Sequence, residues 1–569
     1  MSFSILAAQR EHRWYLNSVC ITLPEHGGRF HAALTGFVSN LDELEQHCSL
    51  LPDKTPTTTA RLIRLLDHGV PEILLQLKGN FSVLVIQPAT GQIWARRDRL
   101  GAHSLYFARQ AIGAGWVVGN SAAQVFKASG HRFEEDPHYL ASFFSLSEGT
   151  SDGHSAFRNV QTVLPGELIA IEGQRVHRTR PPVPVNELLN PSSEDEAIEH
   201  FRALLVNSVA SCLANSADTA VMLSGGMDSG PIAVIADRLC STRGSRLIPI
   251  SWSLRDFPEA DESPWIDQVA DRLSTPLVRL ESSDLLPFSN IATAPVNPEA
   301  PIINPFRPLI NGCYQTAAAN GCTVILNGNA GDELYPSFPL LYRGYVAHRE
   351  WRHLFEDLAQ TGRRGGLQAL WRKPPLRALL SIPMPQRSRQ QPAKWLTDYA
   401  RRHWRSPAIW PPECQDHPLP EYAQQLYGRR MGSGRALEYF QSCELGVERR
   451  DPYDNEELVA FMLNAPFSFS YRHHRSKWIM REAMQGLLPE RIRLKRRTGL
   501  LNGFYQAGKA ANRKAIHSYL FERQKEWRRW ADAETVSTVL KTAQNSSVSA
   551  LLVDRCIGYV NWLQYWRTS

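Results

Sequence analysis

Residues 219–230 join an apolar run to a short polar loop whose residue types suit the binding of a polyphosphate. Residues 219–223 read as a buried strand, and Ser224-Gly225-Gly226-Met227-Asp228-Ser229 follows them directly. The two glycines let the backbone turn sharply and bring amide N–H groups close to an anion. The two serines add hydroxyl donors at the start of the helix expected next. The segment therefore predicts a pyrophosphate-binding loop.

Asp228 places a carboxylate inside this anion-binding loop. Next to a phosphate it would add repulsion unless a divalent cation lay between them, and Mg²⁺ accepts carboxylate oxygens as ligands. The loop therefore predicts Mg·ATP rather than a bare phosphate ester. The alternative is a glycine-rich turn in which Asp228 caps a helix, but the order of strand, Ser, two Gly, Asp and Ser favours the nucleotide.

A second glycine turn with carboxylates follows another short apolar run, residues 323–326. It reads Asn327-Gly328-Asn329-Ala330-Gly331-Asp332-Glu333. Ligands of an open α/β sheet bind at the carboxyl ends of its strands, so neighbouring strands would bring Asp332 to Asp228 across one Mg²⁺. The alternative is that Asp332 and Glu333 only begin a surface helix.

A third cluster, residues 446–455, is densely charged but precedes an apolar, helix-like segment, residues 458–463. Charge beside core-forming residues suggests a buried or cleft-lining network. In that setting Glu448 is a candidate general base. A structural ion pair between Glu448 and Arg450 is the alternative, and spacing alone favours it.

These loops need a scaffold, and the sequence divides into two parts that could supply it. Residues 1–180 read as β-rich, with adjacent strands at 81–86 and 91–96. Residues 181–198 have the Pro, Ser and acidic content of a linker. Residues 199–569 alternate helical patterns with short apolar strands such as 247–251, which indicates a parallel sheet wrapped by helices. After about residue 340 the sequence is helix-compatible, with no strong strand.

Composition limits the classes of protein. The chain has 569 residues, of which 43% are hydrophobic, enough for several buried cores. It has no membrane-spanning run or signal peptide, and its nine dispersed Cys residues read as reduced thiols, so we expect a cytoplasmic protein without zinc. The net charge of +7 comes from basic clusters interleaved with Pro, Trp and Leu, which favours solvated faces over a nucleic-acid groove.

The loop at 224–229 resembles the pyrophosphate loop of the ATP-pyrophosphatase group, which cuts ATP between its α and β phosphates. Taken together, the ordered segments are similar to the asparagine synthetase B superfamily. The other segments that carry this resemblance are 79–81, 97–107, 163–167, 261–262, 328–333, 448–461 and 488–492. The resemblance implies an α/β protein with an N-terminal glutaminase-like (Ntn-type) domain, a C-terminal parallel α/β ATP-pyrophosphatase domain and a helical extension.

The same resemblance implies site residues. Asp228 and Asp332 would hold Mg²⁺, and Glu448 with Lys495 and Arg497 would be catalytic. Related synthetases carry a catalytic Lys at the position of Arg497, so Lys495, two residues away, is a second candidate for that role. The residues expected to hold ATP are Leu223, Ser224, Gly225, Gly226, Asp228, Ser229, Ser251 and Gly328.

Two features of the sequence refine the reaction that the resemblance implies. Glutamine-dependent members begin Met-Cys-Gly, whereas this sequence begins Met1-Ser2-Phe3, so we expect no glutaminase activity and an amine already present on the substrate as nucleophile. Glu448-Arg449-Arg450-Asp451-Pro452 looks most like the Glu-x-Arg-Asp-Pro of lasso peptide cyclases, although Asn455 replaces the usual Asp. The resemblance implies adenylation of an Asp or Glu side chain of a precursor peptide, attack by the peptide's own N-terminal amine, and release of AMP and pyrophosphate.

That reading also implies partners, namely the precursor peptide, a leader peptidase and a leader-recognition protein. Rival readings are a β-lactam-synthetase-like or asparagine-synthetase-like enzyme that acts on a small amino acid, and a non-catalytic scaffold that binds nucleotide or a precursor. A tRNA-modifying pyrophosphatase is disfavoured by the N-terminal domain and by the lack of a Cys pair.

Overall fold

The computed structural model describes residues 5–568 apart from a set of excluded segments. These are 11–12, 19–28, 51–56, 114, 147–151, 184–192, 214–215, 217, 292–295, 361–390, 407–409, 429–433, 496–500 and 542–546. Ser2, Arg496 and Arg497 therefore lie outside the described residues, as does most of the expected linker.

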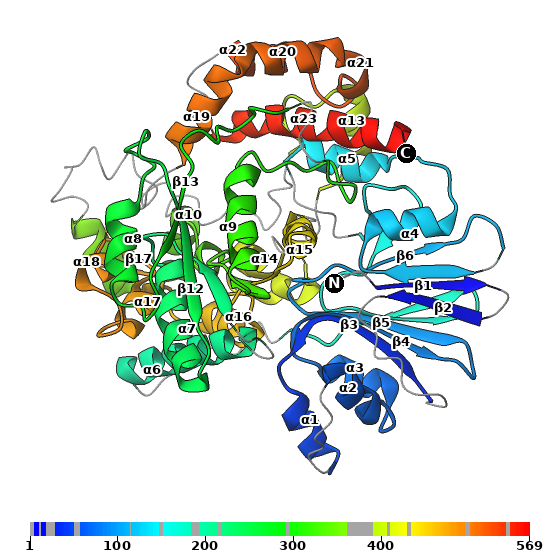
Figure 1. Cartoon of the computed structure of the whole chain (residues 1–569), viewed down its shortest axis with the longest axis horizontal. Coiled ribbons are helices and arrows are strands. Elements are labelled where there is room, and N and C mark those ends of the chain that lie inside the picture. Colours follow the sequence, from blue (N-terminus) through cyan, green and yellow to red (C-terminus); the bar gives the residue numbers. More distant parts are fainter. Residues whose placement is uncertain are drawn as a thin grey trace.

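The N-terminal part contains two five-stranded sheets, ordered β2-β1-β7-β6-β8 and β10-β9-β5-β4-β3, whose paired strands are antiparallel (Figure 1). The strands are β1 (Ile5–Arg10), β2 (Arg13–Ser18), β3 (His31–Val38), β4 (Gly79–Gln87), β5 (Gln92–Arg97), β6 (Tyr106–Arg109), β7 (Trp116–Gly119), β8 (Gln161–Thr162), β9 (Leu168–Glu172) and β10 (Arg175–Thr179). The predicted adjacency of 81–86 and 91–96 is confirmed by the pairing of β4 with β5.

Alternating side chains of β4 build the layers of this domain. Leu84 and Ile86 join the core between the two sheets, which Phe107 of β6 also enters. Val83 and Val85 point to the opposite face, where three helices cover them. Those helices are α1 (Leu41–His47), α2 (Thr58–Leu66) and α3 (Val70–Gln76), while α4 (Ala122–Ser129) and α5 (Pro137–Phe144) follow the strands of the other sheet. The prediction of a β-rich, Ntn-type N-terminal domain is confirmed, and the structure shows it as two stacked sheets with helices on their outer faces.

The C-terminal part is built on a parallel sheet ordered β13-β12-β11-β14-β15. Its strands are β11 (Thr219–Met222), β12 (Leu247–Ser253), β13 (Val278–Glu281), β14 (Val324–Leu326) and β15 (Glu448–Arg450). The strands predicted at 219–223, 247–251 and 323–326 are present. The sequence predicts no strong strand after about residue 340, and the strands found there are short: β15 and, later, a pair of two-residue strands. The three consecutive charged residues of β15 carry no apolar pattern and find partners through ion pairs instead.

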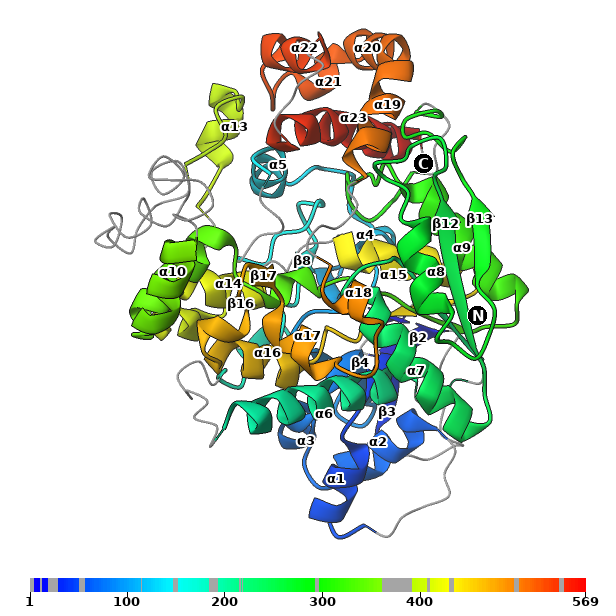
Figure 2. The same cartoon turned by 90° about the vertical axis from the view of Figure 1, so that its left-hand side faces the viewer.

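Helices surround this sheet and continue into a helical layer (Figures 1 and 2). Those nearest the sheet and the site are α6 (Glu194–Cys212), α7 (Ser229–Arg243), α8 (Ser263–Ala270), α9 (Arg307–Ala319), α15 (Gly434–Glu444), α16 (Glu456–Asn464) and α17 (Trp478–Ala483). The other elements before the extension are α10 (Phe338–Ala347), α13 (Asp398–His403), α14 (Pro420–Gly428), α18 (Glu490–Arg493) and the short pair β16 (Tyr471–Arg472) and β17 (Arg475–Ser476). The helical extension comprises α19 (Asn502–Ala511), α20 (Arg513–Glu522), α21 (Gln524–Trp527), α22 (Ala533–Lys541) and α23 (Ser547–Thr568).

The helical extension packs on the N-terminal domain through α5 and α23. Figures 1 and 2 both place these helices side by side. Phe144 of α5 stacks with Trp530 at a ring-centroid separation of 6.0 Å, and Phe157 lies 5.0 Å from Trp566. One continuous aromatic core therefore joins the first domain to the end of the second.

Two further findings concern the described residues only. None of their helices is long and apolar enough to span a membrane. Their cysteines are all free thiols, seven of them buried and Cys48 half-buried.

Candidate active site

Two loops meet at the carboxyl edge of the parallel sheet. Strand β11 lies between β12 and β14 and runs parallel to both, so the loop after β11 and the loop after β14 leave the sheet at the same edge. The two loops are in direct contact, since a Cβ added to Gly331 would lie only 2.3 Å from Oδ1 of Asp228. The predicted neighbourhood of Asp228 and Asp332 is therefore present.

The loop after β11 is held by its own serines. The N–H of Ser224 donates to Oγ of Ser229 at 2.8 Å, and that hydroxyl donates back to the carbonyl of Ser224 at 2.8 Å. Gly225 is required by packing, since a Cβ there would lie 2.2 Å from Cβ of Trp265. Ser229 begins α7, so the loop ends at a helix N-terminus, where the positive end of the helix dipole favours an anion.

Asp228 stands at the N-cap position of α7 without capping it through its side chain. Instead, Nζ of Lys477 lies 2.5 Å from its Oδ1 and 2.6 Å from its Oδ2. The same ammonium lies 2.5 Å from Oδ1 of Asp332. Two carboxylates from two loops thus converge on one cationic atom.

Lys477 has a strained backbone and a buried side chain. Its φ of +59° is in the left-handed region, which is uncommon for a residue with a side chain. The residue is only 7% exposed, whereas the side chain of Asp332 is 87% exposed. Burial raises the pKa of the Asp228 carboxyl, and the nearby Lys477 ammonium opposes that rise. Strain of this kind persists where surrounding structure enforces it, often at functional sites.

The donor set fits Mg²⁺. This ion is usually held by one or two carboxylates together with substrate phosphates, rather than by a full protein cage. Asp228 and Asp332 supply two such carboxylates, and the described residues contain no group of three or more His, Cys, Asp or Glu arranged to hold a metal.

Lys495 also contacts the loop that follows β11. Its Nζ donates to the carbonyl of Gly225 at 3.1 Å and lies 3.0 Å from Oε1 of Glu262. It also lies 4.6 Å from the ring centre of Trp265. Lys495 therefore fixes the loop to α8. Arg497, the other candidate for the catalytic cation, lies outside the described residues.

Glu448 sits in an ion pair. Its Oε2 lies 2.9 Å from a guanidinium nitrogen of Arg450, which is the arrangement that spacing alone favoured. Glu448 is not among the described residues that line the large cavity next to these loops, which is described below. The neighbouring side chain on the cavity wall is Arg449, which binds Asp451 through two hydrogen bonds, of 3.0 and 2.8 Å.

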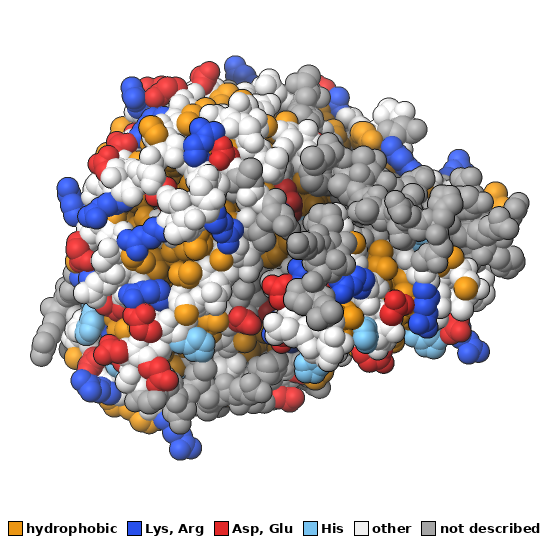
Figure 3. Space-filling model, turned by 60° about the horizontal axis from the view of Figure 1, so that its bottom comes forward, with side chains coloured by type: hydrophobic (Ala, Val, Ile, Leu, Met, Phe, Trp, Pro, Cys, Tyr) orange, Lys and Arg blue, Asp and Glu red, His pale blue; other side chains and the backbone are white. Residues whose placement is uncertain are grey.

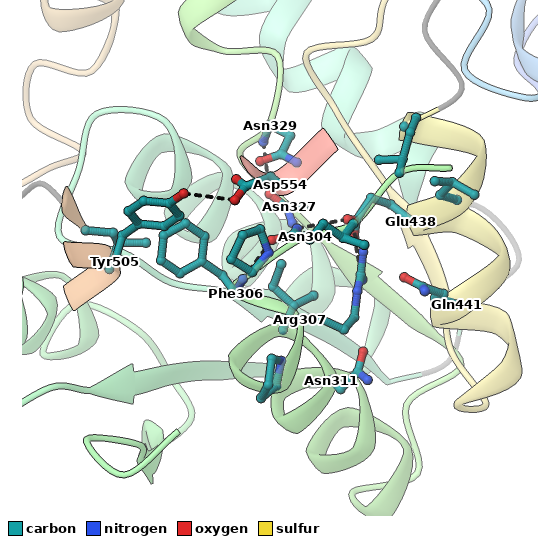
Figure 4. Close-up of a pocket in the computed structure, with 18 of the residues that line it drawn as sticks. Asn304, Phe306, Arg307, Asn311, Asn327, Asn329, Glu438, Gln441, Tyr505 and Asp554 are labelled. Atoms are coloured by element: carbon teal, nitrogen blue, oxygen red, sulfur yellow. Dashed lines mark hydrogen bonds and ion pairs between the residues drawn. The ribbon is translucent and has the colours of Figure 1, made fainter. Parts of the chain in front are cut away.

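One large cavity of about 1370 Å³ contains most of the expected nucleotide residues. At the sheet edge its lining includes Leu223, Ser224, Asp228, Ser229, Ser251, Gly328 and Asp332. Gly225 and Gly226 are not among the described lining residues. The cavity continues past α9 and α15 to the helical extension. Figure 4 shows Tyr505 of α19 at one side and Glu438 and Gln441 of α15 at the other.

Three groups of site residues were not found from the sequence. Lys477 follows a short basic segment whose sequence is typical of an exposed turn. Glu438 accepts hydrogen bonds from Arg307 and Asn304, which both lie more than a hundred positions before it in the sequence. Tyr505 and Asp554 belong to helices that carry no motif. None of these groups has a local signal, because folding alone brings them together.

Two family models match this chain. Residues 200–566, more than half of the chain, match the asparagine synthase family model, and residues 23–180 match the glutamine amidotransferase domain. The chain belongs to the asparagine synthase family.

Similarity to individual members is low. The chain is 21% identical over 437 residues to "Asparagine synthetase [glutamine-hydrolyzing] 3" of Bacillus subtilis, covering 73% of this chain and 66% of that protein. It is 24% identical over 338 residues to "Amidase chry2" of Gibberella zeae, covering 55% of this chain and 48% of that protein. The chain thus spans just under two thirds of the first relative and about half of the second. A solved glutamine phosphoribosylpyrophosphate amidotransferase from B. subtilis, complexed with ADP and GMP, matches with a TM-score of 0.23 and 11% identity, covering 48% of this chain and 74% of that one.

On the face shown in Figure 3, Lys and Arg side chains are interspersed with Asp and Glu and do not gather into one basic tract. The basic segments 363–364, 372–373, 387–389 and 429–430 lie outside the described residues.

Proposed function

We propose that this chain is an ATP-dependent, AMP-forming amide ligase that closes a macrolactam ring in a precursor peptide and so makes a lasso peptide. An Asp or Glu side-chain carboxylate attacks the α-phosphate of ATP, and pyrophosphate leaves. The peptide's N-terminal amine then attacks the acyl carbon, a C–N bond forms, the C–O bond to AMP breaks, and the amine gives up a proton.

The size of the cavity is the observation that carries the peptide as substrate. Pockets for small ligands typically enclose about 300–1000 Å³. This cavity encloses about 1370 Å³, and it joins the pyrophosphate loop to a second lobe lined by α9, α15, α19 and α23. A nucleotide at the sheet edge leaves that second lobe for another substrate. Its extent supports a peptide better than a single small amino acid.

The charges at the sheet edge support adenylation. Asp228 and Asp332 would hold Mg²⁺, which when bound neutralises charge that develops on the departing pyrophosphate. Lys477 lies between the two carboxylates and can transfer its hydrogen bonds to a phosphate oxygen once Mg²⁺ takes its place. Lys495 holds the carbonyl of Gly225, so it keeps the loop in one conformation.

Family membership leaves a rival reading, in which the substrate is a small amino acid and the nitrogen comes from glutamine. The amidotransferase match over residues 23–180 and the name of the B. subtilis relative favour this rival. Ser2 in place of Cys favours the peptide's own amine. We further propose that a leader peptidase and a leader-recognition protein deliver the precursor.

The test uses the full chain, Mg·ATP and a panel of synthetic peptides that differ in the position of a single Asp or Glu. The expected result is a product lighter by one water, formed together with equal amounts of AMP and pyrophosphate. N-acetylated peptides and peptides with Asn or Gln at the acceptor position are the matched controls, and neither should cyclise. ADP as the main nucleotide product would contradict the proposal, and asparagine formation from aspartate and glutamine would establish the rival.

A further inference from the structure

The lobe of the cavity far from the pyrophosphate loop has an aromatic wall. The ring of Tyr505 lies 5.4 Å from that of Phe288 and 6.1 Å from that of Phe306, measured between centroids, and all three residues line the cavity. Tyr139 and Phe143 of α5 extend the wall. Aromatic faces carry partial negative charge, so such a wall attracts organic cations as well as apolar groups.

A single carboxylate is set into this wall. Asp554 of α23 lines the cavity and is only 7% exposed, and its Oδ1 accepts a hydrogen bond of 2.9 Å from the hydroxyl of Tyr505 (Figure 4). In the described part of the chain this is the only hydrogen bond to the Asp554 carboxylate, and no Lys or Arg nitrogen lies within 4 Å of it.

Two cations, Lys509 and Arg555, influence the Asp554 carboxyl, and each of them contacts another group. Nζ of Lys509 donates to the carbonyl of Val539 at 3.1 Å, and the guanidinium of Arg555 lies 4.3 Å from the ring centre of Phe143. Burial raises the pKa of Asp554 to about 7, a rise that the Tyr505 hydroxyl and these two cations oppose. A carboxylate without a close counter-ion is costly to bury, and a bound cation would relieve that cost.

We propose that Asp554, together with the rings of Tyr505, Phe288 and Phe306, forms a binding site for the primary ammonium group of the acceptor substrate. The site rests on the proposed function, since it holds the amine that the ligase reaction consumes. The Asp554 carboxylate would repel the phosphates of ATP and the substrate carboxylate that is activated. These anionic groups would instead bind at the sheet edge, close to Lys477. The cavity would thus separate the two substrates by charge.

The test measures binding of two small probes to the full chain without ATP, by ligand-observed NMR titration at pH 7.5. L-Phenylalaninamide carries a primary ammonium next to an aromatic ring, and N-acetyl-L-phenylalaninamide has the same ring without the charge. We expect the charged probe to bind at least about tenfold more tightly to the wild type. D554N should remove that difference, and Y505F should reduce it.

Folding and charge are controlled separately. Asn keeps the shape of Asp554 and can still accept from Tyr505, so D554N should bind Mg·ATP as the wild type does. D284N, which changes an exposed carboxylate, should leave both probes unaffected. Lowering the pH through about 7 should weaken binding of the charged probe to the wild type and leave D554N unchanged, because protonation neutralises Asp554.

Failure of this site and failure of the proposed function give different results. Equal affinities of the two probes for the wild type, or unchanged affinity of the charged probe for D554N, would overturn the ammonium site while leaving amide formation untouched. Probe binding that depends on Asp554, found in an enzyme that cyclises no peptide, would keep the site and reject the peptide substrate. A D554N variant that no longer binds Mg·ATP would overturn the assignment of Asp554 to the acceptor lobe alone.

Discussion

Nζ of Lys477 lies 2.5 Å from Oδ1 of Asp228, although the two residues are 249 positions apart in the sequence. The lysine occupies the position between Asp228 and Asp332 that a divalent cation would need. If Mg²⁺ binds there with ATP as proposed, it would displace the ammonium from the carboxylates. The Lys477 ammonium and the proposed Mg²⁺ would therefore compete for the same position between the two carboxylates.

The first prediction concerns the two carboxylates. D228N and D332N should each lower AMP and pyrophosphate formation by about 10²-fold or more, because metal and charge stabilisation of a transition state amounts to several kcal/mol. Circular dichroism should show an unchanged fold, most clearly for D332N, whose side chain is exposed. D284N is the control, and a rate near wild type in either site variant would reject a metal shared by Asp228 and Asp332.

The second prediction separates the role of Lys477 from that of the metal. K477M leaves two carboxylates facing each other without a cation, so Mg²⁺ alone should raise the thermal midpoint of K477M more than that of the wild type. Turnover should nevertheless fall by about 10²-fold, because a donor to the phosphates is lost. An equal effect of Mg²⁺ on both proteins would show that the metal does not compete with Lys477.

The sequence was sufficient to predict those parts of the site that lie within one loop. The strand-loop-helix at 219–230 has a local pattern, and so do the glycine turn at 327–333 and the adjacent strands β4 and β5. The sequence also predicts that Asp228 and Asp332 lie close together, because neighbouring parallel strands end at the same edge of a sheet.

Other parts could not be predicted because tertiary packing alone creates them. Lys477 directly follows a short hairpin, and its own left-handed backbone conformation helps to bring its side chain to the two loops. Strand β15 has no apolar pattern, and Glu448 pairs with Arg450 and is not among the described residues that line the large cavity. Asp554 and Tyr505 are 49 residues apart on two helices without a motif. Such contacts depend on helix packing that periodicity does not specify.

The third prediction is that the full chain does not hydrolyse glutamine and that S2A is silent. A hydroxyl is a weaker nucleophile than the thiol of glutamine-dependent relatives. Incubation with glutamine, with and without Mg·ATP and peptide, should release no glutamate above a no-enzyme control. Glutamate release that disappears in S2A would show that Ser2 is a working nucleophile.

The fourth prediction concerns Glu299, a carboxyl that links the two domains. It accepts hydrogen bonds from the N–H of Ala122 at 2.6 Å and from Oγ of Ser121 at 2.5 Å, at the start of α4. Burial raises its pKa from 4.5 to about 7. A raised carboxyl pKa favours the folded state below pH 4.5, and that contribution is lost as the pH rises through about 7.

The thermal midpoint of E299Q relative to wild type should therefore increase between pH 5 and pH 8, with a free-energy change of at most about 3 kcal/mol. D284N should show no such trend. A difference between E299Q and wild type that is constant with pH would mean that Glu299 stays ionised in the folded protein.

The fifth prediction assigns roles within the basic segment 495–497. Lys495 bonds the carbonyl of Gly225 and pairs with Glu262, so it fixes the pyrophosphate loop as well as adding positive charge. K495A should lower pyrophosphate release by about 10²-fold. E262Q should weaken the same contact, and the combined variant should be less impaired than the product of the two single effects, because both remove one interaction.

Arg497 is tested by separating the two half-reactions. If Arg497 supplies the cation for ring closure, R497A should still release pyrophosphate while closing the ring at least about tenfold more slowly, since the tetrahedral oxyanion forms only in the second step. R497K, which keeps the charge but not the planar fork, should recover part of that loss. R496A is the matched control and should cyclise within a few-fold of wild type. Ring closure near the wild-type rate in K495A, R496A and R497A alike would exclude this segment from the chemistry.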